Sequence, residues 1–145
     1  MVVLTDTNIS LRLLQPQHPQ SSMAATAVAE LRARGADLCI APQNLVEFWV
    51  VATRPVPLNG LGMSPLMATG EVRKLRGFFR LLEGKSGVAD AWERLVAKHL
   101  VSGKLAHDAH LVAVMQVYSV TDILTFNGAD FRRFPGITIL DPAQF

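Results

Sequence analysis

Met1-Val-Val-Leu-Thr5, followed by Asp6-Thr7-Asn8, opens the chain and sets the pattern for the rest of it. An apolar run that ends at polar, helix-capping side chains is typical of a buried strand followed by a helix. We therefore predict a strand from Val2 to Thr5 and a short helix from Ile9 to Leu14, which ends before Pro16.

The same change from strand to helix recurs along the chain, with no internal repeat and no linker. Strands that alternate with helices imply βαβ crossovers and a mostly parallel sheet. We therefore expect the α/β fold class and one domain over residues 1–145. Beyond the first pair, the expected helices are 21–34, 42–53, 64–76, 88–101 and 105–118, the expected strands are 38–41, 78–82, 121–125 and 137–140, and the segments between them include a loop at 54–63 and a turn with a short helix at 127–134.

Composition limits the class of protein. The chain has 145 residues, of which 50% are hydrophobic, so it can bury a core and is not a disordered chain. Its one cysteine, Cys39, excludes an intrachain disulfide, and its apolar neighbours predict a buried thiol, as in a reducing compartment. No basic region precedes the first apolar run, and no apolar stretch reaches the ~18 residues that a membrane span requires. We expect a cytoplasmic protein without a membrane segment.

Acidic side chains interrupt or adjoin the apolar segments. Asp6 and Asp130 each follow a predicted strand, and sites in parallel sheets form at the carboxyl ends of strands. A carboxylate among apolar residues is costly unless it is paired, hydrogen-bonded or metal-bound. Hard cations such as Mg²⁺ prefer carboxylate oxygens and water. The sequence therefore predicts a divalent-cation site formed from Asp6, Glu47, Asp108 and Asp130.

Each acid also has a purely structural interpretation. Asp6 can cap the first helix, and Asp108 is favourable to the helix dipole in a first helical turn. Glu47 lies in Leu45-Val-Glu-Phe-Trp-Val-Val51, a segment that is apolar on nearly every side and therefore predicts a buried helix. An ionised glutamate in such a helix needs a partner, and we favour a functional role over a salt bridge with Arg54.

Two histidines flank Asp108 and raise the possibility of zinc. The spacing of His107 and His110 differs from the His-Glu-x-x-His pattern of helical zinc enzymes, and no cysteine joins them. We therefore reject a zinc site. We interpret His107 as a polar residue at the start of a helix rather than as a general acid.

Basic residues form local groups. Of the fourteen basic residues ten are arginine, with one group from Arg73 to Arg80 and a pair at Arg132-Arg133. Arginine suits phosphate recognition because its planar guanidinium donates in a bidentate geometry. A solvated helix face is the alternative for each group.

Four segments in order resemble the PIN-domain family, and in particular the VapC-type toxin ribonucleases of type II toxin–antitoxin systems. They span almost the whole chain, which makes the ordered set more specific than any one motif. The segments are Leu4-Thr-Asp-Thr-Asn8, Pro42-Gln-Asn-Leu-Val-Glu47, His107-Asp-Ala-His-Leu111 and Leu124-Thr-Phe-Asn-Gly-Ala-Asp-Phe131.

The resemblance implies a three-layer α/β/α sandwich and a Mg²⁺- or Mn²⁺-dependent endoribonuclease that cleaves single-stranded RNA. By motif position, Asp6, Glu47 and Asp108 match the three recurrent acids, and the fourth position falls on Asn127 or Asp130. We expect Asp6 and Asp108 to be the primary metal ligands, with Glu47 as a ligand or as the holder of a metal-bound water. The polar residues that support the acids match Asn8 and Thr125, with Asn127 beside them.

The resemblance also implies partners. VapC-type proteins pair with an antitoxin and form homodimers. The segment Val56–Met67 carries more apolar residues than an isolated surface loop needs, so it either binds such a partner or covers the protein's own core. The candidate contacts to RNA phosphates are Arg73, Arg76, Lys104 and Arg132.

Two other functions compete with the nuclease. A catalytically silent PIN module would bind RNA or protein without cleaving it, and the asparagine at position 127 keeps this alternative open. A receiver-like phosphoacceptor domain also binds Mg²⁺ at strand ends, but it needs an acceptor aspartate after a central strand and a lysine after a late strand. Neither is evident, because Phe126 and Asn127 follow the predicted strand at 121–125.

Overall fold

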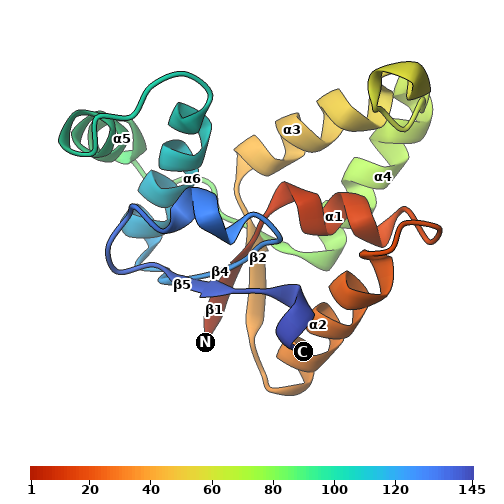
Figure 1. Cartoon of the computed structure of the whole chain (residues 1–145), viewed down its shortest axis with the longest axis horizontal. Coiled ribbons are helices and arrows are strands. Elements are labelled where there is room, and N and C mark those ends of the chain that lie inside the picture. The colour runs from red at the N-terminus through yellow and green to blue at the C-terminus, as the bar shows by residue number, and fades with distance from the viewer.

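The computed structural model describes all residues from Met1 to Phe145 and contains one five-stranded sheet. Every strand pair is parallel, and the strand order is β3-β2-β1-β4-β5 (Figure 1). The expected mostly parallel sheet is therefore wholly parallel. The strands are β1 (Val2–Thr5), β2 (Asp37–Ile40), β3 (Arg80–Leu81), β4 (Asp122–Leu124) and β5 (Thr138–Leu140).

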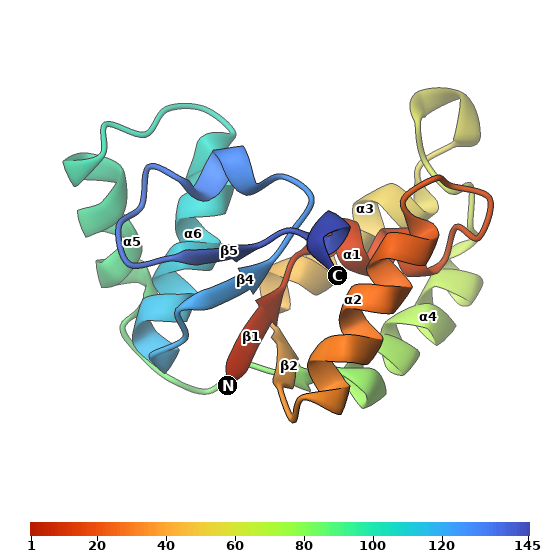
Figure 2. The ribbon, with the colours of Figure 1, turned by 60° about the horizontal axis from the view of Figure 1, so that its bottom comes forward.

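Helices cover both faces of this sheet, with α5 and α6 on one side and α1 to α4 on the other (Figures 1 and 2). None of the helices is both long and apolar enough to cross a membrane. The α-helices are α1 (Thr7–Leu13), α2 (Ser21–Ala33), α3 (Pro42–Thr53), α4 (Pro65–Phe78), α5 (Val88–Lys98) and α6 (Leu105–Tyr118), and the short 3₁₀ helices are η1 (Val56–Leu58), η2 (Gly128–Phe131) and η3 (Pro142–Gln144).

Alternate residues of each strand feed two separate cores. Val3 packs with the helices α1 to α4, whereas Leu4 packs with α5 and α6. Cys39 joins the second core, where its thiol donates to the carbonyl of Val3 at 3.3 Å and burial raises its pKa to about 12. Strands buried on both faces explain the continuous apolar runs in the sequence. The expected three-layer α/β/α sandwich and the buried thiol are both confirmed.

The order of the strands reverses between β1 and β4, at the centre of the sheet. Ligands of open α/β sheets bind in the crevice at the carboxyl ends of the strands, where the order reverses. Thr5 is in register with Leu124, and the amide of Asp6 donates to the carbonyl of Leu124 at 3.0 Å. The residues that follow β1 and β4 therefore meet at this crevice.

The predicted elements all exist, and their ends differ in instructive ways. The helix α1 begins at Thr7, two residues before the predicted Ile9, because Asp6 caps it. The predicted strand at 78–82 is only Arg80–Leu81, since the apolar Phe78 belongs to α4. The helix α5 ends at Lys98 rather than 101, because Leu100 adopts a left-handed backbone with φ of 50°.

The segment after α3 folds back onto the end of that helix. Leu61, Gly62 and Met63 donate their amides to carbonyls of the last turns of α3 at 3.0, 2.9 and 2.8 Å. Leu61 and Met63 also pack against the core, whereas Val56 and Leu58 are 66% and 64% exposed. The segment therefore covers the protein's own core through Leu61 and Met63, and the role of its exposed residues in binding a partner stays a prediction.

Gly60 is required for this fold-back, because a Cβ there would lie 1.9 Å from the carbonyl oxygen of Arg54. We expect Gly60→Ala to lower the free energy of unfolding by roughly 1–3 kcal/mol, the usual cost of overpacking. Urea unfolding followed by circular dichroism measures the change. The matched control is Gly70→Ala in α4, where a Cβ meets nothing within 4 Å and alanine should stabilise the helix by up to about 1 kcal/mol. Equal effects of the two substitutions would contradict this account.

Candidate functional site

Asp6 stands at the carboxyl end of β1 and is 8% exposed. Its Oδ1 accepts from the amide of Thr7 at 2.7 Å, so it is the helix cap that the sequence allowed. Its Oδ2 accepts from the hydroxyl of Thr125 at 2.6 Å and from the side-chain amide of Asn8 at 3.0 Å. Burial nevertheless raises the pKa of Asp6 above its ordinary value, and the charges of Glu47 and Asp130 act in the same direction.

Asn8 and Thr125 lie where the sequence predicted supporting polar residues. Asn8 donates to the hydroxyl of Thr125 at 3.2 Å and accepts from the amide of Phe126 at 3.3 Å. The amide of Asn127 donates to the Thr125 hydroxyl at 2.9 Å, but the Asn127 side chain is exposed. These bonds tie the start of α1 to the segment after β4 and fix one rotamer of Asp6.

Glu47 is held from two sides by hydrogen bonds. The hydroxyl of Thr7 donates to its Oε2 and the side-chain amide of Gln43 donates to its Oε1, both at 2.7 Å. The buried Asn44 donates in turn to the Thr7 hydroxyl at 3.0 Å. Glu47 forms no salt bridge with Arg54, which was the structural alternative.

The prediction that the helix around Glu47 is buried on all sides is wrong, because Val46 and Val50 of α3 are 65% and 50% exposed. Its inward face carries Asn44, Phe48 and Ala52. The helix α3 therefore has two apolar faces. One packs against the protein's core, and the other is exposed.

Gln43 connects α3 to α6 across the site, and sequence reasoning missed it. Its amide nitrogen donates to the carbonyl of His107 at 2.8 Å, and its amide oxygen lies 2.6 Å from Nδ1 of His110. That oxygen can only accept, so Nδ1 of His110 carries the hydrogen. Burial and the neighbouring His107 lower the pKa of His110, which favours its neutral form. Through Nδ1, His110 thus links α6 to α3.

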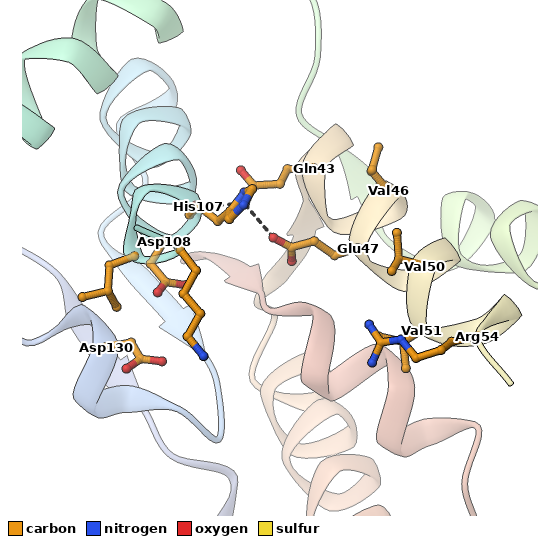
Figure 3. Close-up of a pocket in the computed structure, with 11 residues that line it drawn as sticks. Gln43, Val46, Glu47, Val50, Val51, Arg54, His107, Asp108 and Asp130 are labelled. Atoms are coloured by element: carbon orange, nitrogen blue, oxygen red, sulfur yellow. Dashed lines mark hydrogen bonds between the residues drawn. The ribbon is translucent and has the colours of Figure 1, made fainter. Parts of the chain in front are cut away.

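Glu47, Asp108 and Asp130 line one cavity of about 580 Å³. Figure 3 shows Glu47 projecting from α3 towards a facing wall that carries Asp108 and Asp130. Asp108 comes from the first turn of α6, and Asp130 from η2. Asp6 is not part of the lining, but its charge and those of Glu47 and Asp130 act on Asp108. The four predicted acids therefore belong to one electrostatic cluster.

This cluster strongly perturbs Asp108. Burial raises its pKa to about 6, assisted by the charges of Asp130, Asp6 and Glu47 and opposed by His107. Like-charged carboxylates that share a site disfavour one another's ionisation. A bound cation or protonation would reduce the repulsion among these carboxylates.

The donor set suits a hard divalent cation in chemistry, because carboxylate oxygens are the ligands that Mg²⁺ and Mn²⁺ prefer. No group of three or more His, Cys, Asp or Glu side chains is already arranged so that it could hold a metal ion. The carboxylates therefore match such an ion in type and charge, and would have to draw together to coordinate it.

Basic residues are placed unevenly around the cavity. Lys104 lines it, as does Arg54, whose role sequence reasoning had limited to a salt bridge. Neither forms a salt bridge. Arg132 lines a second, adjacent cavity, whereas Arg73 and Arg76 are exposed on α4 and line neither of the two. The role of Arg73 and Arg76 as phosphate contacts stays a prediction.

Comparison with known proteins gives a family match over most of the chain. The model of the PIN domain matches residues 3–137. Ribonuclease VapC48 from two strains of Mycobacterium tuberculosis is 32% identical over 94 residues, which is 63% of this chain and 63% of that protein. The match thus spans less than two thirds of the relative's length.

Solved structures share the fold at low sequence identity. VapBC2 from Rickettsia felis bound to a DNA fragment from their promoter gives a TM-score of 0.73 at 14% identity, covering 97% of this chain and 98% of that chain. VapBC-1 from nontypeable Haemophilus influenzae gives a TM-score of 0.71 at 16% identity, covering 99% of each chain. At such identities the likeness shows the fold alone.

The raised pKa of Asp108 has a measurable effect on stability. A carboxyl whose pKa rises from 3.8 to about 6 on folding binds more protons in the folded chain between these values. The free energy of unfolding therefore falls as pH rises through this window. With divalent ions chelated, we expect Asp108→Asn to make the fall shallower and to stabilise the protein at neutral pH by at most about 2 kcal/mol. Thermal unfolding over a pH series measures this, and identical slopes for the two proteins would contradict it.

Proposed function

The chain belongs to the PIN-domain family, and on that basis we propose that it is a metal-dependent endoribonuclease. The observation that carries this proposal is the carboxylate cluster at the carboxyl end of the parallel sheet, with Asp108 perturbed by its acidic neighbours. Perturbed carboxyls in a cavity are typical of functional sites. The partial likeness to a relative named a ribonuclease adds support.

We assign the metal, Mg²⁺ or Mn²⁺, to Asp6, Asp108 and Glu47. When bound, such an ion lowers the pKa of a coordinated water and neutralises charge on a phosphate. Asn8 and Thr125 hold Asp6 in one rotamer, and Thr7 and Gln43 hold Glu47. Partners of this kind orient metal ligands and raise their affinity.

Asp130, rather than Asn127, fills the fourth acidic position in this proposal. Two observations support the assignment. Asp130 lines the cavity, and its charge raises the pKa of both Asp6 and Asp108. The side chain of Asn127 is exposed outside the cavity lining.

The substrate in this proposal is single-stranded RNA, as the family resemblance implied. Lys104 and Arg54 extend from opposite sides of the cavity, from the start of α6 and the end of α3, and neither is neutralised by a salt bridge. Both can therefore contact phosphates on either side of the scissile one. The affinity for RNA should weaken with added salt in proportion to the number of such contacts.

Substitution of the acids tests the activity. We expect Asp6→Asn and Asp108→Asn to abolish cleavage of labelled single-stranded RNA in Mg²⁺ or Mn²⁺, as should EDTA. Asn8→Ala, which loosens Asp6, should cost about 10–100-fold, as is typical of partners behind metal ligands. The matched control is Asp90→Asn, which changes an exposed aspartate on α5. This variant should cleave the RNA as fast as the unchanged protein does.

Two results would contradict the proposal. Cleavage that survives both Asp6→Asn and Asp108→Asn would mean a contaminant or a different active site. Intact RNA throughout, with a broad RNA pool and the antitoxin absent, would favour the silent binding module instead.

We further propose that a cognate antitoxin neutralises the enzyme and that it docks along α3 and α4. A cavity of about 340 Å³ between these helices is lined entirely by apolar residues, among them Val46, Trp49 and Val72. Exposed apolar side chains continue this surface, which fits an amphipathic helix laid in a groove. They are Val46, Val50, Val56, Leu58, Leu66 and Met67. The alternative occupant is a second copy of this chain, since VapC-type proteins also form homodimers.

Charged substitutions test this surface. We expect Leu58→Asp and Leu66→Asp to weaken binding of the antitoxin encoded by a neighbouring reading frame by about tenfold or more, measured by calorimetry, because an apolar anchor is lost. Leu100→Asp is the matched control, because Leu100 is 86% exposed on the opposite layer beside α5. A changed oligomer mass with unchanged antitoxin affinity would assign the surface to self-association, and no change in either would remove it from both roles.

A further inference from the structure

A second cavity lies beside the carboxylate site and has no assigned role. It has a volume of about 350 Å³, which is within the range of small-ligand sites, roughly 300–1,000 Å³. It opens between the residues after β4 and those after β5, where Thr125 and Asp141 stand. It therefore occupies the same carboxyl-end crevice as the first cavity.

The short helix η2 separates the two cavities and contributes to both. Asp130 lines the first cavity, whereas Gly128 and Ala129 line the second, where Arg132 follows directly after the helix. The partition lies tight against β5, because a Cβ on Gly128 would be 2.7 Å from Cγ2 of Ile139. Thr125, which donates to Asp6, lies beneath the second cavity. An extended ligand that crosses η2 therefore passes from the acids into the second cavity within a short distance.

Three polar side chains of the second cavity are free to bind a ligand. Asp141 uses Oδ1 to accept from the amide of Ala143 at 2.9 Å, but its Oδ2 has no hydrogen-bond partner and it forms no salt bridge. Gln144 and Arg132 also line the cavity, and neither side chain has a partner in the protein. The cavity thus offers a carboxylate, an amide and a guanidinium.

We propose that this cavity binds a guanine base of single-stranded RNA, one nucleotide away from the scissile phosphate, with Asp141 reading the base. An ionised carboxylate has only acceptors, so it pairs best with a base edge that presents two adjacent N–H donors. Guanine alone does so, through N1–H and the N2 amino group, and the amide of Gln144 can donate to its O6. Arg132 binds the phosphate of the same nucleotide.

The other bases match this set less well. The edges of adenine and cytosine pair one amino group with an acceptor nitrogen, which would face the carboxylate. Uracil presents one N–H between two carbonyl oxygens. Proteins that read single-stranded RNA commonly bind unstacked bases by this edge. The inference rests on the proposed ribonuclease activity, and it adds a base preference that nothing in the carboxylate site provides.

The test removes the free acceptor of Asp141. Asp141→Asn keeps an oxygen to cap η3 and replaces the free oxygen with an amino group, which cannot accept from N1–H and the N2 amino group of guanine. Cleavage of a randomised RNA pool, read by sequencing, should give the unchanged protein at least about a tenfold preference for guanine at one position beside the cut, and Asp141→Asn should lose most of this preference. Gln144→Ala, which leaves the cap intact, should weaken the guanine preference.

Binding measured in EDTA separates this inference from the activity. Fluorescence anisotropy with short RNAs that differ only in one guanine or adenine should show the same preference without cleavage, and the same loss of preference in Asp141→Asn. Asp90→Asn is the matched control and should keep the guanine preference. A preference that is absent, or that survives both Asp141→Asn and Gln144→Ala, would overturn the inference. Base-specific binding without cleavage would overturn the proposed activity and leave the base site standing.

Discussion

The parallel pairing of β1 with β4 is the constraint on which the site depends. It joins the first strand of the chain to one that is more than a hundred residues later, and the amide of Asp6 completes the ladder at the carbonyl of Leu124. Because the strand order reverses here, the helices that follow β1 and precede β4 lie on opposite faces. Asp6 and Thr125 can then meet in the open crevice between the two layers, with Asp108 approaching from α6.

Neutral hydrogen-bond donors hold two of the four acids, Asp6 and Glu47, in place. Thr7, Gln43, Asn8 and Thr125 each donate to a carboxylate oxygen, which lowers the cost of holding these charges in a half-buried cavity. None of these donors carries a charge. The groups that hold these acids therefore leave their negative charge unneutralised, which suits a cation site.

Much of this arrangement could be predicted from the sequence, because the signals were local. Strand ends followed by polar residues located Asp6 and Asp130, and the apolar segments around the acids made isolated carboxylates conspicuous. Glu47 was found partly for a wrong reason, since the helix around it exposes Val46 and Val50. The strand at 78–82 was too long because two adjacent phenylalanines look alike in a sequence, although Phe78 ends a helix.

The residues that were missed act through contacts between distant parts of the chain. Gln43 is a polar residue on a helix, and nothing nearby indicates that it binds His110, 67 positions later. Arg54 lines the cavity from the end of α3, where the following segment folds back and makes a close approach at Gly60. Hydrogen bonds and backbone contacts between residues so far apart in the chain produce no periodic pattern in the sequence, so they could not be predicted from it.

The valines of α3 have a consequence for how this protein can change. Val46 and Val50 line both the carboxylate cavity and the apolar groove between α3 and α4, so one helix edge serves two surfaces. A substitution at either position alters the wall of the cavity and the floor of the groove at once. A substitution that improves one surface therefore also changes the other, and we expect these two positions to vary less during evolution than the exposed Leu66 and Met67, which line neither cavity.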